Sequence, residues 1–122
     1  MRAARMLVGI VALLHAYFLV LEMFLWTQPI GLETFQMTPE AAAASAVVAK
    51  NQGLYNGFLV AGLLWGLLAR TEGRSILTFF LVCIVIAGVF GAATAKLSIL
   101  FVQALPAAIA LVLVRRARSS IA

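Results

Sequence analysis

The chain has 122 residues, of which 65% are hydrophobic, and its mean hydropathy of +1.11 excludes a water-soluble globule, whose apolar share is about 45–50%. At about 20 residues a span, this length accommodates four transmembrane helices in a single domain, residues 1–122. The formal net charge of +5 does not point to nucleic acid, because the basic residues are dispersed at segment ends and do not gather on one polar face.

The first predicted span covers residues 6–26 and follows Arg2 and Arg5. It is too long for the apolar core of a signal peptide and has no small-residue cleavage site after it, so it is interpreted as a retained span. His15 and Glu22 lie seven residues apart, which places both ionisable groups on nearly the same helix face. A charged group at the bilayer centre costs roughly 2.5–3.5 kcal/mol, so the carboxylate needs a partner, a proton or a water-filled cavity.

The connection over residues 27–50 is the long polar segment of the chain. Thr38 as N-cap, Pro39 at the first helical position and Glu40 in the first turn predict the start of a short extra helix. Its alanine-rich continuation to Val48 is expected either to lie on the membrane surface or to run directly into the second span. Gly53 is the expected bend between the two segments.

The remaining spans are predicted at residues 51–69, 75–94 and 97–114, which makes the chain an all-α membrane protein with a four-transmembrane-helix bundle. Pro106 is expected to kink the fourth span, with Gln103 one turn before it. Small residues recur every four positions, a spacing that lets helix backbones approach closely and that suits a homo-oligomer through Gly-rich faces. These residues are Gly53, Gly57 and Ala61, then Gly62 and Gly66, then Ala87, Gly91 and Ala95.

Lys and Arg are distributed unevenly between the two sides of such a bundle. One side would carry Arg2, Arg5, Arg70, Arg74, Arg115, Arg116 and Arg118, and the other only Lys50 and Lys96. The positive-inside rule then predicts that both termini are cytoplasmic and that the 27–50 connection is outside.

With this orientation, nearly all polar side chains within the spans fall in the outer half of the membrane. They predict an outward-facing polar pocket for a small polar or cationic ligand, a lipid headgroup or a proton. Its lining is expected to be His15, Glu22, Gln52, Tyr55 and Asn56, with Trp26, Asn51, Lys96 and Gln103 as rim or support.

A structural interpretation of the same residues stays open. Amides often fasten transmembrane helices and Trp often marks the interface. Glu22 would then be salt-bridged to Lys50 or Lys96, or hydrogen-bonded to Gln52 or Asn56. His15 would be a neutral, satisfied residue between helices.

Several chemistries are absent from the sequence. With no Asp and one His, the chain offers no Ser-His-Asp triad, no HExxH zinc site and no His-rich di-iron bundle. The single Cys83 excludes an intrachain disulfide and a CxxC motif. No catalytic residue, metal or cofactor is therefore predicted, and a non-enzymatic role is favoured.

Two strings carry a resemblance to a known family: His15-Ala-Tyr-Phe-Leu-Val-Leu-Glu22-Met-Phe-Leu-Trp26 and Asn51-Gln-Gly-Leu-Tyr-Asn56-Gly-Phe-Leu. Together with the length and the four-span layout, they resemble the small bacterial membrane family labelled domain of unknown function 1304. The resemblance implies a multi-pass protein of the bacterial inner membrane and supplies no activity. The matched residues are His15, Glu22, Trp26, Asn51, Gln52, Gly53, Tyr55, Asn56 and Gly57.

A looser similarity is to the small multidrug resistance exporters, which have four spans and a carboxylate in the first. This chain differs from them in its off-centre Glu22, its long external connection and its strong charge bias. The sequence thus leaves three hypotheses: binding or transport of a small polar or cationic molecule or lipid headgroup; a structural or assembly subunit; and a lipid- or quinone-linked membrane enzyme with His15 and Glu22 as proton carriers.

Overall fold

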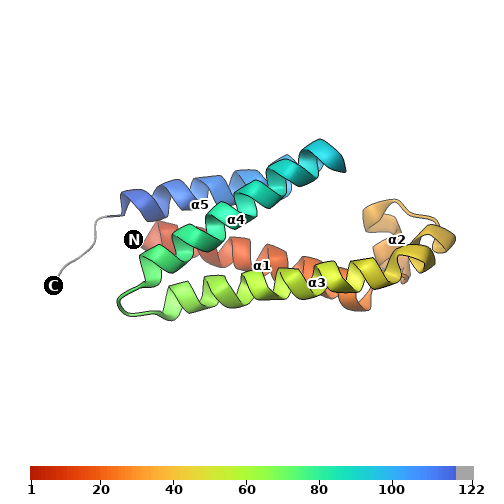
Figure 1. Cartoon of the computed structure of the whole chain (residues 1–122), viewed down its shortest axis with the longest axis horizontal. Helices are drawn as coiled ribbons and strands as arrows, with labels where there is room; N and C mark the ends of the chain where they lie inside the picture. The colour runs from red at the N-terminus through yellow and green to blue at the C-terminus, as the bar shows by residue number, and fades with distance from the viewer. Residues whose placement is uncertain (118–122) are drawn as a thin grey trace. The chain divides into compact units, whose positions relative to one another are not determined.

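The computed structural model describes residues 1–117, and every regular element in this range is helical, which confirms the all-α prediction (Figure 1). The elements are α1 (Arg2–Phe24), α2 (Pro29–Phe35), α3 (Pro39–Leu68), α4 (Gly73–Thr94), the π-helical segment η1 (Leu100–Ala104) and α5 (Leu105–Arg116). Arg118, one of the seven cations behind the predicted orientation, lies outside the described residues.

The chain divides into two compact units. The α1–α3 unit is Leu13–Val60, and it holds the later part of α1, all of α2 and the first two thirds of α3. The α4–α5 unit combines Met1–Ala12 with the chain from Ala61 onwards.

Two helices in residues 1–117 are long and apolar enough to cross a membrane, namely α1 and α4. α3 has the length but carries Lys50, Asn51, Gln52 and Asn56 in its middle, which lowers its hydropathy. α5 has only 12 residues because η1 precedes it. By length and hydropathy, the helices at the first and third predicted spans could cross a membrane, whereas those at the second and fourth do not meet both criteria.

The predicted helix start at Thr38 is confirmed. α3 begins at Pro39, and the backbone N–H of Ala41 donates to Thr38 Oγ1 at 3.2 Å. Of the two courses expected for the alanine-rich segment, the structure has the second: α3 runs without interruption from Pro39 to Leu68. At about 1.5 Å per residue it is about 45 Å long, whereas a bilayer core is about 30 Å thick.

The expected bend at Gly53 is wrong, because this glycine lies inside α3 and serves close packing. A Cβ at Gly53 would clash with the Met23 side chain and lie 3.2 Å from the Leu19 carbonyl oxygen, and one at Gly57 would lie 2.9 Å from Leu19 Cδ1. α3 therefore approaches α1 at two positions one turn apart. This is the close contact that the small-residue spacing predicted.

The short helix α2 was not anticipated, since the sequence placed the extra helix at Pro39. Pro29 lies in its first turn and Gln36, with φ of 53°, ends it in the left-handed conformation. Trp26, which lies between α1 and α2, contacts both α2 and α3. The centre of its ring lies 4.7 Å from that of Phe35 in α2, and its Nε1 donates to Ser45 Oγ in α3 at 3.0 Å. Trp26, Phe35 and Ser45 are called the Trp26 cluster below.

In the α4–α5 unit, α4 packs against η1 and α5. One close contact is at Gly88, where a Cβ would lie 2.7 Å from the Ala104 backbone nitrogen. The kink predicted at Pro106 stays a prediction, and just before this residue the structure has a π-helical segment, in which the Leu105 N–H donates to the Leu100 carbonyl. Pro106 has no N–H to give to the preceding turn, so a locally widened helix is the expected accommodation.

Replacement of Gly88 by Ala tests the close contact of α4 with η1. The new methyl group would meet backbone atoms of Ala104, so we expect overpacking to lower the free energy of unfolding by about 1–3 kcal/mol. Gly9→Ala in α1 is the control: its Cβ would have no described atom within 4 Å, and Ala should stabilise the helix by about 0.5–1 kcal/mol. Thermal unfolding in detergent measures both, and an unchanged Gly88→Ala protein would contradict the packing.

The Trp26 cluster is tested by a double-mutant cycle. Trp26→Phe keeps an aromatic ring but removes the indole donor, and Ser45→Ala removes its acceptor. Each should cost about 0.5–1.5 kcal/mol for the lost hydrogen bond. The double variant should cost less than the sum of the two, because both remove the same interaction. Strict additivity of the two losses in chemical denaturation would show that the bond contributes nothing.

Candidate functional site

Glu22 near the end of α1 and Asn56 in α3 are brought into direct contact. Asn56 Nδ2 donates to Glu22 Oε2 at 2.7 Å, and both side chains are partly buried. The contact follows from the packing beside it, since Gly53 lies one turn before Asn56 and fits against the Glu22 Cβ. Of the partners expected for Glu22, the structure therefore gives Asn56.

The Glu22 carboxyl group has no cationic partner within residues 13–60. Lys50, one of the expected salt-bridge partners, is exposed on α3 and forms no ion pair in this unit. A carboxylate can accept about four hydrogen bonds, and Asn56 supplies one from a neutral amide. Glu22 thus keeps most of its acceptor capacity for another group.

Gln52 lies one turn before Asn56 on α3, and Tyr55 directly precedes Asn56. Gln52 and Asn56 share a helix face at i, i+4 spacing. Both Gln52 and Tyr55 are exposed, and within residues 1–117 the Gln52 amide makes no hydrogen bond. Tyr55 is 53% exposed, with its ring 6.1 Å from that of Phe58. Both side chains are therefore accessible, and their place in a site with Glu22 stays a prediction.

Two other predicted residues have their polar groups engaged. His15 is 1% exposed, and no buried side-chain nitrogen or oxygen in the described chain lacks a hydrogen-bond partner. This burial suits the neutral, satisfied His15 that the structural interpretation expected. Asn51 donates to the Val47 carbonyl of its own helix at 2.9 Å, so its amide is directed at the backbone and not at Glu22.

The residues expected at the rim fall into two groups. Trp26 is held in the Trp26 cluster and supports the connection between α1 and α3. Lys96, exposed between α4 and η1, and Gln103, half-buried in η1, belong to the α4–α5 unit. Their place beside Glu22 stays a prediction.

Sequence reasoning missed Ser45 as the acceptor for Trp26. The two residues are 19 positions apart, and Ser45 stands among alanines as an ordinary helix residue. One feature of the sequence could have indicated such a partner. A partly buried Trp at the end of an apolar span needs a hydrogen-bond acceptor for its indole N–H.

Chemically, the Glu22–Asn56 pair offers one carboxyl group and one amide, and the amide of Gln52 and the phenol of Tyr55 are predicted to complete the site. Such a set can bind a cation or a proton, with the amides and the phenol orienting a polar molecule. In residues 1–117 no three His, Cys, Asp or Glu side chains gather in a way that could hold a metal ion.

Comparison with known proteins supports the resemblance seen in the sequence. A family described as protein of unknown function (DUF1304) matches residues 9–115. The uncharacterized protein YpaA of Lactococcus lactis subsp. lactis (strain IL1403) is 30% identical over 105 residues, which cover 84% of this chain and 88% of YpaA. No solved structure matches the chain. The family match spans both motifs that carried the resemblance, and the chain belongs to the DUF1304 family.

Proposed function

We propose that this protein is a four-span protein of the bacterial inner membrane that binds a small cation or cationic molecule at Glu22, in the outer half of its bundle. Gln52, Tyr55 and Asn56 would orient the ligand, and such a site would serve its uptake, export or sensing.

The membrane arrangement in this proposal adds two spans to α1 and α4: the second half of α3, from about residue 51, and η1 with α5. The cations support it. Arg70 lies in the short connection between α3 and α4, Arg74 lies at the start of α4, and Arg115 and Arg116 end α5. Lys50 lies within α3 just before the proposed second span, and Lys96 lies between α4 and η1, before the proposed fourth span. The length of α3 agrees, since about 15 Å of it would extend beyond the bilayer core with α2.

One observation carries the binding proposal: the Glu22 carboxyl group lies in an apolar helix and has a neutral amide as its partner. Carboxylates in membrane spans are rare and costly unless they pair or face a polar cavity. Asn56 offsets little of that cost because it brings no positive charge. A cationic ligand would supply what the chain does not.

A second candidate function is structural, and a different observation favours it. The Glu22–Asn56 and Trp26–Ser45 hydrogen bonds both join α1, or the residues just after it, to α3. In this alternative the polar side chains only fasten the helices, and the protein acts as a subunit of a larger assembly.

The membrane arrangement is tested by cysteine labelling in intact cells with a membrane-impermeant maleimide. Glu33→Cys in α2 should react from outside, whereas Thr71→Cys between α3 and α4 should react only after the cells are opened. The unaltered chain, whose one cysteine is the half-buried Cys83, is the control. Equal reaction of both variants in intact cells would contradict the proposed orientation.

The binding site is tested by Glu22→Gln, which removes the charge but keeps a carbonyl oxygen able to accept from Asn56. We expect it to weaken the binding of tetraphenylphosphonium, an apolar monovalent cation, at least tenfold in equilibrium dialysis, the equivalent of about 1.4 kcal/mol. Native mass spectrometry of protein purified from membranes should show a retained molecule in the wild type that the variant lacks.

Two controls separate binding from fastening. Glu33→Gln, an equal charge change at an exposed position of α2, should leave binding unchanged. Asn56→Ala leaves the carboxyl group without its donor and should lower stability by about 1–3 kcal/mol. If Glu22→Gln binds the cation as the wild type does while Asn56→Ala is destabilised, the structural alternative is correct.

A further inference from the structure

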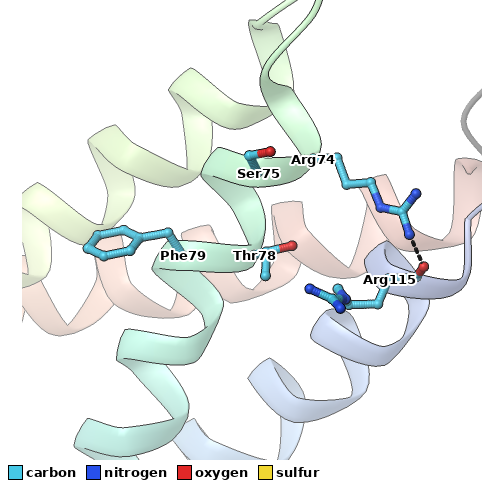
Figure 2. A pocket seen from close by; sticks show the side chains of 5 residues that line it. All are labelled: Arg74, Ser75, Thr78, Phe79 and Arg115. Atoms are coloured by element: carbon cyan, nitrogen blue, oxygen red, sulfur yellow. Dashed lines mark hydrogen bonds between the residues drawn. The ribbon is translucent and has the colours of Figure 1, made fainter.

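A pocket of about 500 Å³ opens in the α4–α5 unit, between the first turns of α4 and the end of α5. It is lined by Arg74, Ser75, Thr78, Phe79 and Arg115 (Figure 2). Figure 2 shows the Arg74 side chain reaching from α4 to the backbone carbonyl of Arg115, to which its Nη2 donates, while the Arg115 side chain extends from α5 toward α4. The pocket shares no residue with the site proposed for cation binding.

The pocket carries two positive charges that no acidic side chain of the described residues neutralises. Neither Arg74 nor Arg115 forms an ion pair within residues 1–117, and the bond to the Arg115 carbonyl uses one of the five N–H donors of Arg74. The hydroxyl groups of Ser75 and Thr78 add donors on the α4 side. Ser75 also lies in the first turn of a 22-residue helix, where the unpaired backbone N–H groups favour an anion.

This set of donors suits a phosphate group. The planar guanidinium matches two phosphate oxygens at once, and hydroxyl donors commonly complete such sites. A bound phosphate would accept hydrogen bonds from both helices and would offset part of the positive charge of the two arginines.

The surroundings of the pocket favour a phosphate that belongs to a lipid. α4 is one of the two candidate membrane helices and begins at Gly73, so the pocket lies at the membrane end of a span, where headgroups lie. Phe79, one turn further along α4, is 63% exposed and gives the pocket an apolar wall. Basic pockets between transmembrane helices on the cytoplasmic side are typical binding sites for anionic headgroups.

We propose that this pocket binds the phosphate of an anionic phospholipid in the cytoplasmic leaflet. The leaflet assignment rests on the proposed orientation of the spans, whereas the recognition of the phosphate depends only on the pocket. The lipid would join the start of α4 to the end of α5.

The test uses the full chain in mild detergent and dioctanoyl phosphatidylglycerol as the probe, with binding followed by native mass spectrometry. We expect the wild type to retain phosphatidylglycerol at least tenfold better than dioctanoyl phosphatidylcholine, whose phosphate is paired with a cationic choline. Glycerophosphoglycerol, which carries the same phosphodiester without the acyl chains, should bind at least tenfold more weakly than phosphatidylglycerol. Equal affinity for the two would assign the pocket to a soluble phosphate and overturn the lipid.

A double variant of the two pocket arginines tests the site, and a double variant of two neighbouring arginines is its control. Arg74→Gln with Arg115→Gln should weaken phosphatidylglycerol binding at least tenfold. Arg70→Gln with Arg116→Gln removes the same net charge from the connection just before α4 and from the last residue of α5, outside the pocket lining, and should change binding less than threefold. Equal losses in both double variants would show general surface attraction and overturn the proposed site.

Two further measurements keep the result decisive. If the pocket double variant does not fold, Thr78→Val, which keeps the shape and removes one donor, should still weaken binding by at least twofold. The phosphatidylglycerol preference of the wild type needs no variant, and its absence would overturn the proposal. Binding in detergent is independent of orientation and of Glu22, so a failure of lipid binding is distinct from a failure of cation binding or of the labelling pattern.

Discussion

Close approach of helix backbones at a glycine is the constraint on which each unit of this protein depends. In the α1–α3 unit, Gly53 lets α3 lie against the backbone of α1, and only at that separation can Asn56 reach Glu22. In the α4–α5 unit, Gly88 does the same for α4 against Ala104 in η1. Where water is absent, dispersion contacts and hydrogen bonds hold helices together, so small residues decide which helices meet and where.

The polar side chains divide according to whether the chain itself satisfies them. His15 and the Trp26 cluster have hydrogen-bond partners within the chain, and the Trp26–Ser45 bond fastens the end of the first segment to α3 in the α1–α3 unit. The Glu22 carboxyl group accepts one hydrogen bond, from the neutral amide of Asn56. Arg74 and Arg115 carry charge that no described acid offsets. Partners from outside the chain are to be sought at the last two places, because unpaired charge is the costly quantity at a membrane.

Local signals in the sequence were sufficient for some of these features. Thr38 and Pro39 have a capping chemistry that acts within one turn, and Pro106 perturbs the turn before it by its own covalent structure. The sequence could not decide the course of the chain at Gly53, because glycine permits both a bend and a close contact, and packing against α1 selected the contact. At this position the deciding interaction joins residues distant in sequence.

The candidate site shows the same division. The i, i+4 spacing placed Gln52 and Asn56 on one face, but which of them meets Glu22 depends on the rotation of α3 about its axis. The Arg74 and Arg115 pocket was out of reach of sequence reasoning for a similar reason, since 41 residues separate its two charges. Each arginine alone resembles an ordinary marker of membrane orientation.

The continuity of α3 has a mechanical consequence. Ser45 in the Trp26 cluster and Asn56 beside Glu22 lie on the same unbroken helix, three turns apart. A stiff rod transmits tilt and rotation along its length, so a displacement imposed on the cluster would be felt at the carboxyl group through the movement of Asn56. Both hydrogen bonds fix the position of the same helix, so loss of the Trp26–Ser45 bond would change the geometry of the Glu22–Asn56 bond.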